Sequence, residues 1–528
     1  MSKTLSEASF SAESIKKRGG GIFGVEWSTL IKAFFGGNAF VAMFVLALIT
    51  IFLFREGAGF FPQYRKDMEL YRSSGQEFVG LLKAELDQFD TLQQQLSQVQ
   101  VQVLTDLYEE GKDWEEVTRL TAPFQEFLDK TAGAADPLRR VVKKAIDVTA
   151  AAKEHVVVNN TRRGITGVDL GALMNEQQSE AYLAEAREAV VAMLPEVHTA
   201  NEQFLMRLKD ALANMPEVEL PSAQAALDVY KENAATFIKK MPGLEKKLDT
   251  YDPDRPYTMM QTFVGFIFGS QWTTNSSWQD FYGIWPLLSG SLIVTVVALS
   301  LAVPLGIFAA VYVNQVANTS EQNLIKPYIE FISAIPSVVI GFFGIAVFGT
   351  FLRSLSEQDW LSWVPFFPIS ERLNASTAGA LLALMAVPTI FTLAEDALNN
   401  VPKAFTEASE AMGATRWQTI WRIQIPTALS GIISAVLLGF GRVIGETMVV
   451  LLCAGNRIAV PDLSKGLGVF VEPVHTMTGI IAQEMGEVVP ASIHYRALFC
   501  VGIFLFFLSL TINYIAQVIV RRYKISAG

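Results

Sequence analysis

The chain has 528 residues, of which 51% are hydrophobic and 18% are charged, and its formal net charge is −10. A mean hydropathy of +0.31 is too high for a typical soluble protein, so lipid-facing and water-facing segments must be segregated along the chain. The acidic excess argues against nucleic-acid binding, because polyanions bind to basic surfaces. No Gly-x-x-x-x-Gly-Lys-Ser/Thr loop occurs in the sequence, so ATP hydrolysis is expected from another chain.

Residues 1–32 are mostly polar and predict a cytoplasmic tail, and the apolar stretch 33–54 that follows predicts a first membrane span. A crossing takes about 20 apolar residues. The stretch is too long for the apolar part of a cleavable signal peptide, and no small-residue cleavage site follows it, so it is expected to stay as an anchor. Five further stretches predict spans at residues 281–313, 331–352, 375–394, 427–455 and 497–520.

Basic residues flank the first and the last of these spans. Because Lys and Arg are retained on the cytoplasmic side, both termini are predicted to be cytoplasmic. The sequence therefore predicts an all-α polytopic membrane protein with six helices, an extracytoplasmic insert at 55–280 and a membrane core at 281–528. Cys453 and Cys500 both lie in spans and predict no disulfide framework. The basic residues are Lys16, Lys17, Arg18, Lys32, Arg521, Arg522 and Lys524.

The insert is predicted to consist of several long helices that pack antiparallel through coiled-coil-like seams. Apolar residues recur three and four positions apart in the runs 89–103, 186–208 and 227–244, which is the spacing of one helix face. Pro195 predicts a kink in the second run. Turn signals at 132–137, 163–171 and 215–221 separate the helices.

Neither histidine of the insert, His155 or His198, has a partner at metal-ligand spacing, so no metal site is predicted there. Two roles stay open for the insert: a decoration particular to this chain, or a docking surface for an external binding protein or the cell envelope.

The segment 399–426, between the fourth and fifth spans, carries the most specific motif. Its last twenty residues read EASEAMGATRWQTIWRIQIP and resemble the EAA loop of ABC importer permeases. Gly413 is expected to turn a short helix sharply back, and Pro426 suits the first turn of the next helix. The resemblance assigns ATPase coupling to Glu407, Ala408, Gly413, Ile423 and Pro426, whereas Ser409 and Ile425 are conservative departures from the pattern.

Three other stretches narrow the resemblance to the phosphate-uptake (Pst) permeases, specifically the PstC-type subunit. They are FGSQW at 268–272 with YGIWPLLSGSLIVT at 282–295, AIPSVVIGFFG at 334–344, and GFGRVIGETMVV at 439–450. The first span, with FREGAGFF at 54–61, also resembles the start of that family, but the insert of some two hundred residues departs from it.

The resemblance implies a bacterial inner-membrane permease subunit of an ABC importer for inorganic phosphate. Its implied partners are a second, PstA-type permease, an ATP-binding-cassette ATPase dimer and an extracytoplasmic phosphate-binding protein. No cofactor is implied for this chain itself, because ATP and Mg would bind to the ATPase subunits.

Two charged residues in the fifth span, Arg442 and Glu446, are predicted to lie in the substrate pathway. Each charge in the hydrocarbon core costs roughly 2.5–3.5 kcal/mol on insertion scales, so a reason for its presence is expected. Their spacing of four predicts that they share one helix face and pair, and a guanidinium matches the oxygens of phosphate. In the resembled permeases an arginine and a glutamate of this motif are implicated in phosphate passage. A purely structural ion pair is the alternative.

Weaker pathway predictions are Thr447 and Ser337, the latter beside Pro336, which is expected to break its helix and free carbonyls near Ile332. The amphipathic segment 457–496 predicts an outer gate in which His475 and His494 are polar surface residues.

Two other functions stay open. A permease for molybdate or sulfate has a similar glycine-arginine-glutamate signature. A receptor with a helical sensor domain fits one span followed by a large outer block, but it predicts a signalling helix where this chain continues through four more spans.

Overall fold

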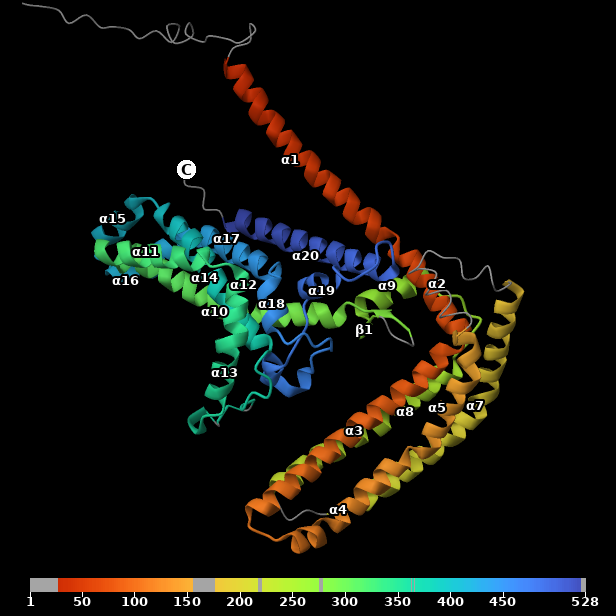
Figure 1. Cartoon of the computed structure of the whole chain (residues 1–528). Coiled ribbons are helices and arrows are strands. Elements are labelled where there is room, and N and C mark those ends of the chain that lie inside the picture. Colours follow the sequence, from red (N-terminus) through yellow and green to blue (C-terminus); the bar gives the residue numbers. More distant parts are fainter. Residues whose placement is uncertain are drawn as a thin grey trace, which may run out of the picture. The chain divides into compact units, whose positions relative to one another are not determined.

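The structure is a computed structural model that describes residues 27–154, 176–216, 221–274, 279–361, 363–364 and 366–523. The chain divides into two compact units (Figure 1). The membrane unit comprises Met1–Phe60, Pro286–Glu487 and Tyr495–Gly528, and the helical unit comprises Phe61–Trp285 and Val488–His494.

The membrane unit is built mainly from helices. Its helices are α1 (Trp27–Ala58), α10 (Trp285–Val311), α11 (Thr319–Ala334), α12 (Ser337–Phe343), α13 (Gly349–Ser356), α14 (Ala375–Asn399), α15 (Lys403–Ala411), α16 (Arg416–Thr419), α17 (Ile425–Ile444), α18 (Met448–Cys453), α19 (Met477–Glu484) and α20 (Ile493–Tyr523). Short π-helical turns lie at Tyr312–Val316, Gly344–Phe348 and Ile420–Gln424, and 3-10 turns at Asp359–Leu361 and Leu463–Val471.

Six helical segments in the part of the chain that the structure describes are long and apolar enough to cross a membrane, and each overlaps one predicted span. The prediction of an all-α polytopic membrane protein is therefore confirmed. The second span begins later than predicted, because residues Phe281 and Tyr282 form a short strand and helix α10 begins at Trp285.

Helix α14 is the centre of the membrane unit, since α10, α17 and α18 all pack around it. Small residues allow this close approach. A Cβ atom on Gly306 of α10 or on Gly439 of α17 would lie 2.8 or 2.7 Å from side-chain atoms of Ile390 in α14. These two glycines fix the distance at which α10 and α17 pack on α14.

The predicted break at Pro336 is confirmed, because α11 ends at Ala334 and α12 begins at Ser337. Proline has no N–H to donate and its ring excludes the preceding helical turn. The carbonyl of Ile332 is not left free, however, because it accepts a hydrogen bond of 3.3 Å from the N–H of Ile335.

In its described residues, the helical unit contains six long helices and a small strand pair. They are α2 (Phe60–Ser73), α3 (Gln76–Glu109), α4 (Trp114–Ala134), α5 (Asp136–Ala152), α7 (Glu176–Ala213) and α8 (Pro221–Asp249), followed by α9 (Met259–Phe268), β1 (Trp272–Thr273) and β2 (Phe281–Tyr282). Strands β1 and β2 are antiparallel, with Trp272 opposite Tyr282.

The predicted apolar runs form the core of the helical unit. The apolar residues at this spacing are buried, apart from Leu244, which is partly buried. The buried ones are Phe89, Leu92, Leu96, Val99 and Val103 in the first run, Ala186, Val190, Met193, Val197, Ala200, Phe204 and Leu208 in the second, and Leu227, Tyr230, Ala234, Phe237 and Met241 in the third. The rings of Phe89 in α3, Phe204 in α7 and Phe237 in α8 meet at centroid distances of 5.0 to 6.2 Å. Residues spaced three and four apart on three helices therefore bury one shared core.

Helices α3 and α8 are antiparallel, as predicted. Phe89 contacts Phe237, and the earlier Phe78 contacts the later Tyr251. Helix α7 continues through Pro195 without ending. His198 pairs with Asp249 at 2.9 Å, whereas His155 and the predicted turn at 163–171 lie outside the described residues.

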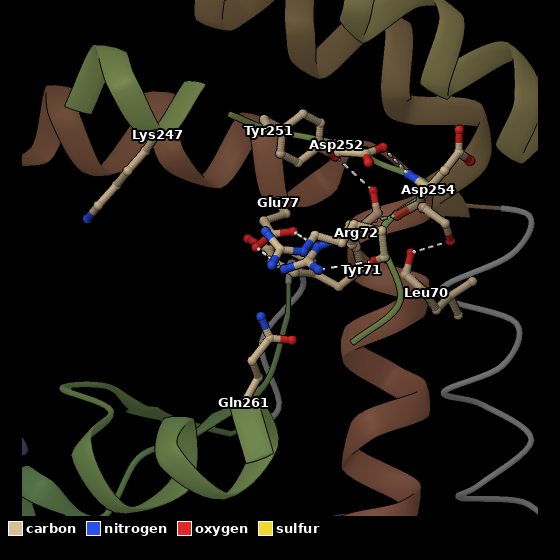
Figure 2. A network of polar contacts seen from close by, with 12 residues as sticks. Leu70, Tyr71, Arg72, Glu77, Lys247, Tyr251, Asp252, Asp254 and Gln261 are labelled. Atoms are coloured by element: carbon tan, nitrogen blue, oxygen red, sulfur yellow. Dashed lines mark hydrogen bonds and ion pairs between the residues drawn. The ribbon is translucent and has the colours of Figure 1, made fainter. Parts of the chain in front are cut away.

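Arg72 at the end of α2 joins the beginning of the helical unit to its end (Figure 2). Its guanidinium forms two hydrogen bonds of 2.6 and 3.1 Å with the Glu77 carboxylate and one of 3.1 Å with the carbonyl of Arg255, and it lies 4.9 Å from the ring centroid of Tyr257. The hydroxyl of Tyr251 donates to the carbonyl of Arg72 at 2.8 Å. Segments 179 or more residues apart are thereby held together.

Candidate substrate pathway and coupling loop

The fifth span is interrupted within the motif GFGRVIGETMVV. Helix α17 ends at Ile444, and α18 begins at Met448. Gly445 closes α17 with hydrogen bonds from its N–H to the carbonyls of Gly441 and Val443. Non-helical backbone at membrane depth is tolerated where it is buried in protein or lines a polar cavity. Residues 445–447 are therefore a candidate part of a substrate pathway.

Arg442 lies in the last turn of α17, before this break. Arg442 is exposed at the surface of the membrane unit, and its Nη1 donates a hydrogen bond of 3.0 Å to Thr389 Oγ1 on α14. Among the described residues no ion pair joins Arg442 to Glu446. The predicted pairing on one helix face is therefore wrong, because the helix ends two residues before Glu446.

Glu446 is half-buried in the break between the two helices. One oxygen of its carboxylate accepts a hydrogen bond of 3.3 Å from the N–H of Met448, and its backbone carbonyl accepts one of 2.8 Å from Thr478 Oγ1. The second bond ties the break to the first turn of α19.

A small cavity opens beside this break, and α10, α17, α18 and the start of α19 line it. Its polar lining consists of Ser291, Thr295, Glu446, Thr476 and Thr478, and the rest of its lining is apolar. The four hydroxyl residues are all buried, with at most 8% of each exposed. The cavity therefore presents a carboxylate-bearing residue and four hydroxyl-bearing residues.

Gly290 lets α10 approach the segment before α19, since a Cβ there would lie 2.1 Å from the carbonyl of His475. This approach brings Ser291 Oγ within 2.9 Å of the N–H of Met477, which donates to it. His475 itself is buried, with 2% of its surface exposed, and bonds to Gln483 at 3.1 Å. The prediction of a surface histidine is wrong, because this segment packs under α10.

Of the four predicted pathway residues, Glu446 lines the cavity. Arg442 lies in the turn before it, and Thr447 caps α18 without a side-chain hydrogen bond to that helix. Ser337 begins α12 and does not line the cavity.

Sequence reasoning missed the four hydroxyl residues of the cavity. The spacing of four between Ser291 and Thr295 is a signal that was available, because it places two hydroxyls on one face of a mostly apolar helix. Thr476 and Thr478 carry no such signal, since their place depends on how their segment packs.

The segment 399–426, named the coupling loop here after the motif that it resembles, has the local structure that the motif predicts. Helix α15 contains Glu407 and Ala408, and Gly413 turns the chain with φ of 82°, a conformation that favours glycine. Pro426 lies at the start of α17. Ser409 Oγ lies 2.9 Å from Thr419 Oγ1, so the two arms of the loop are bonded together.

The same loop exposes large apolar side chains. They are Phe405, Met412, Trp417 and Trp421, of which Met412 is 81% exposed. Large exposed apolar groups beside a braced turn are typical of a surface that a partner covers.

The chain is similar to known transport proteins over about half of its length. Residues 302–525 match the family described as "Binding-protein-dependent transport system inner membrane component". The "Probable ABC transporter permease protein YqgH" of Bacillus subtilis (strain 168) is 30% identical over 262 residues, which are 50% of this chain and 79% of that protein. The "Phosphate transport system permease protein PstC" of Pasteurella multocida (strain Pm70) is 26% identical over 272 residues, which are 49% of this chain and 82% of that protein.

A solved structure of the MetNI methionine ABC transporter in inward-facing conformations covers 46% of this chain and 94% of that chain, with 19% identity and a TM-score of 0.33.

Proposed function

The chain belongs to the family of binding-protein-dependent transport system inner membrane components, and we propose that it is the PstC-type permease subunit of an ABC importer for inorganic phosphate. It is a multi-pass protein of the bacterial inner membrane. The observation that carries the phosphate assignment is the broken fifth span. There, a membrane arginine without a carboxylate partner among the described residues lies one turn before a polar cavity.

Arg442 is proposed to contact the anion. Its guanidinium has five N–H groups in a planar fork, and the hydrogen bond to Thr389 uses one of them. The remaining donors match two oxygens of a phosphate at once. Glu446 is proposed to line the same path rather than to neutralise Arg442.

Both termini are proposed to be cytoplasmic and the helical unit extracytoplasmic, with coiled-coil-like packing of its seams. The basic residues beside the first and last spans support this orientation. It places the coupling loop in the cytoplasm, where an ATPase is found.

The coupling loop is proposed to receive force from an ATP-binding-cassette ATPase dimer. Glu407, Ala408 and Gly413 belong to the turn that would dock, while Ile423 and Pro426 carry the motion into α17. The exposed Met412 and aromatic side chains support a covered surface here. A second, PstA-type permease and an extracytoplasmic phosphate-binding protein are the proposed remaining partners, with ATP and Mg bound to the ATPase.

Uptake of radiolabelled phosphate tests the proposal. A strain that lacks its phosphate importers would carry this chain with its neighbouring transport genes, and uptake would be measured with and without excess sulfate or molybdate. Saturable, ATP-dependent phosphate uptake that the other anions do not reduce is expected. Loss of phosphate uptake in excess sulfate or molybdate would instead support the alternative oxyanion.

A further inference from the structure

The hydroxyl groups around the cavity have their hydrogen atoms engaged within the protein. A hydroxyl has a single hydrogen to donate and two lone pairs with which to accept. Ser291 Oγ donates to the carbonyl of Leu287 at 2.8 Å, and Thr295 Oγ1 donates to the carbonyl of Ser291 at 2.7 Å. Thr478 Oγ1 donates to the carbonyl of Glu446 at 2.8 Å. These three hydroxyls can offer a ligand lone pairs only.

Thr476 completes the pattern. Its Oγ1 accepts a hydrogen bond of 3.0 Å from the N–H of Gly479 and lies 3.4 Å from Thr478 Oγ1. Because the hydrogen of Thr478 already goes to a carbonyl, Thr476 must be the donor between these two hydroxyls. The carboxylate of Glu446 has no hydrogen to give. The polar lining of the cavity is therefore made of acceptors.

We propose that this cavity, lined by Ser291, Thr295, Thr478 and Glu446, recognises the hydroxyl hydrogens of protonated phosphate and so rejects fully deprotonated tetrahedral oxyanions. The inference rests on the proposed phosphate function and adds a selectivity element to it. Inorganic phosphate carries one or two P–O–H groups near neutral pH, whereas sulfate and molybdate carry none. The P–O–H edge would face the cavity, and the bare oxygens would face Arg442.

The energetic reason is that acceptors repel acceptors. A cavity that offers only lone pairs gains a hydrogen bond from a P–O–H group and gains none from an analogue that lacks this hydrogen. A sulfate oxygen would in addition meet the lone pairs of the threonines and the negative charge of Glu446. Discrimination thus requires no steric difference between the two anions.

The test uses the purified complex of the chain with its partner permease and ATPase in lipid nanodiscs, without the binding protein. The melting temperature is measured with phosphate and with sulfate at equal ionic strength, since a ligand that binds to the folded state raises it. In the wild type, phosphate is expected to raise the melting temperature more than sulfate does.

Two variants change the acceptors. Thr295→Val removes one hydrogen-bond acceptor at nearly constant side-chain volume, and it is expected to weaken phosphate binding about tenfold. Thr295→Ser keeps the hydroxyl and is expected to restore phosphate binding. Glu446→Gln replaces a carboxylate oxygen with an N–H donor and is expected to make sulfate as stabilising as phosphate. Thr427→Val is the matched control, because Thr427 bonds to its own helix at Ile423 and does not line the cavity.

The proposal is overturned if both variants keep the wild-type preference for phosphate, or if neither anion changes the melting temperature of a wild-type complex that imports phosphate. Phosphate uptake by the wild type in proteoliposomes, supplied with binding protein, is measured in parallel. A wild type that imports no phosphate contradicts the proposed function, whereas intact uptake with unchanged selectivity in the variants contradicts only the role of the cavity.

Discussion

Glu85 of α3 makes the stability of the helical unit depend on pH. Its side chain is buried, with 1% exposed, and neither carboxylate oxygen has a hydrogen-bond partner among the residues that the structure describes. Burial, with a smaller effect of the nearby Glu245 charge, raises the pKa of the Glu85 carboxyl from 4.5 to about 8. The folded protein therefore keeps a proton that the unfolded chain releases.

The direction of the effect follows from this difference. Stability is full below the unfolded pKa of 4.5, falls as the pH rises, and levels off above the folded pKa of about 8. At about 1.36 kcal/mol per pKa unit, the free energy of unfolding is expected to fall by roughly 3 kcal/mol between about pH 5 and about pH 8. Glu85→Gln has no charge to bury, so it should remove this dependence.

Hydrogen exchange of the α3 and α8 amides in the intact chain measures the effect, after correction for the intrinsic pH dependence of exchange. Asp87→Asn is the matched control, because Asp87 lies on the same helix and is exposed. Wild-type protection that does not fall over this pH range, or that falls as much in Glu85→Gln, would refute the reasoning.

Three further predictions concern the membrane unit and Arg72 of the helical unit. Gly413→Asp should leave the protein inserted but abolish phosphate uptake, since it places a charge on the docking turn and strains a φ of 82°; normal uptake at wild-type protein levels would contradict this. Arg442→Lys and Arg442→Gln should both impair phosphate uptake at least about tenfold. The ammonium of lysine cannot form the bidentate contact, and glutamine has no positive charge. Wild-type transport by Arg442→Gln would show that the phosphate path lies elsewhere. Arg72→Ala should lower the free energy of local opening of the segment after α8 by about 2 kcal/mol. Hydrogen exchange of that segment measures this, and unchanged protection would show that the hydrogen bonds of Arg72 to Glu77 and Arg255 do not stabilise it.

The six spans and the three seams could be predicted from the sequence because the length of an apolar stretch and the spacing of apolar residues are both local properties. Phe89 and its neighbours at three and four residues determine one face of a helix wherever that helix packs. The turn at Gly413 was equally local, because a glycine just after a short helix permits the left-handed φ that ends the helix.

The sequence could not place Glu446 relative to Arg442. A spacing of four implies one helix face only if the helix continues, and the glycine-rich stretch before Glu446 fits both a continuous helix and a break. Packing of α17 on α14, with Thr389 as the partner of Arg442, accompanies the break that separates the two charges.

The cavity belongs to the tertiary structure alone. Ser291 meets the Met477 amide across 186 residues, and Thr478 meets Glu446 across 32. A threonine in a membrane helix bonds to its own backbone by default, so its sequence position does not reveal which lone pairs remain for a ligand. The hydrogens of Ser291 and Thr295 go to carbonyls of their own helix, whereas that of Thr478 goes to the carbonyl of Glu446. Only the packing of α10 against the α18–α19 segment decides that their remaining lone pairs line one cavity.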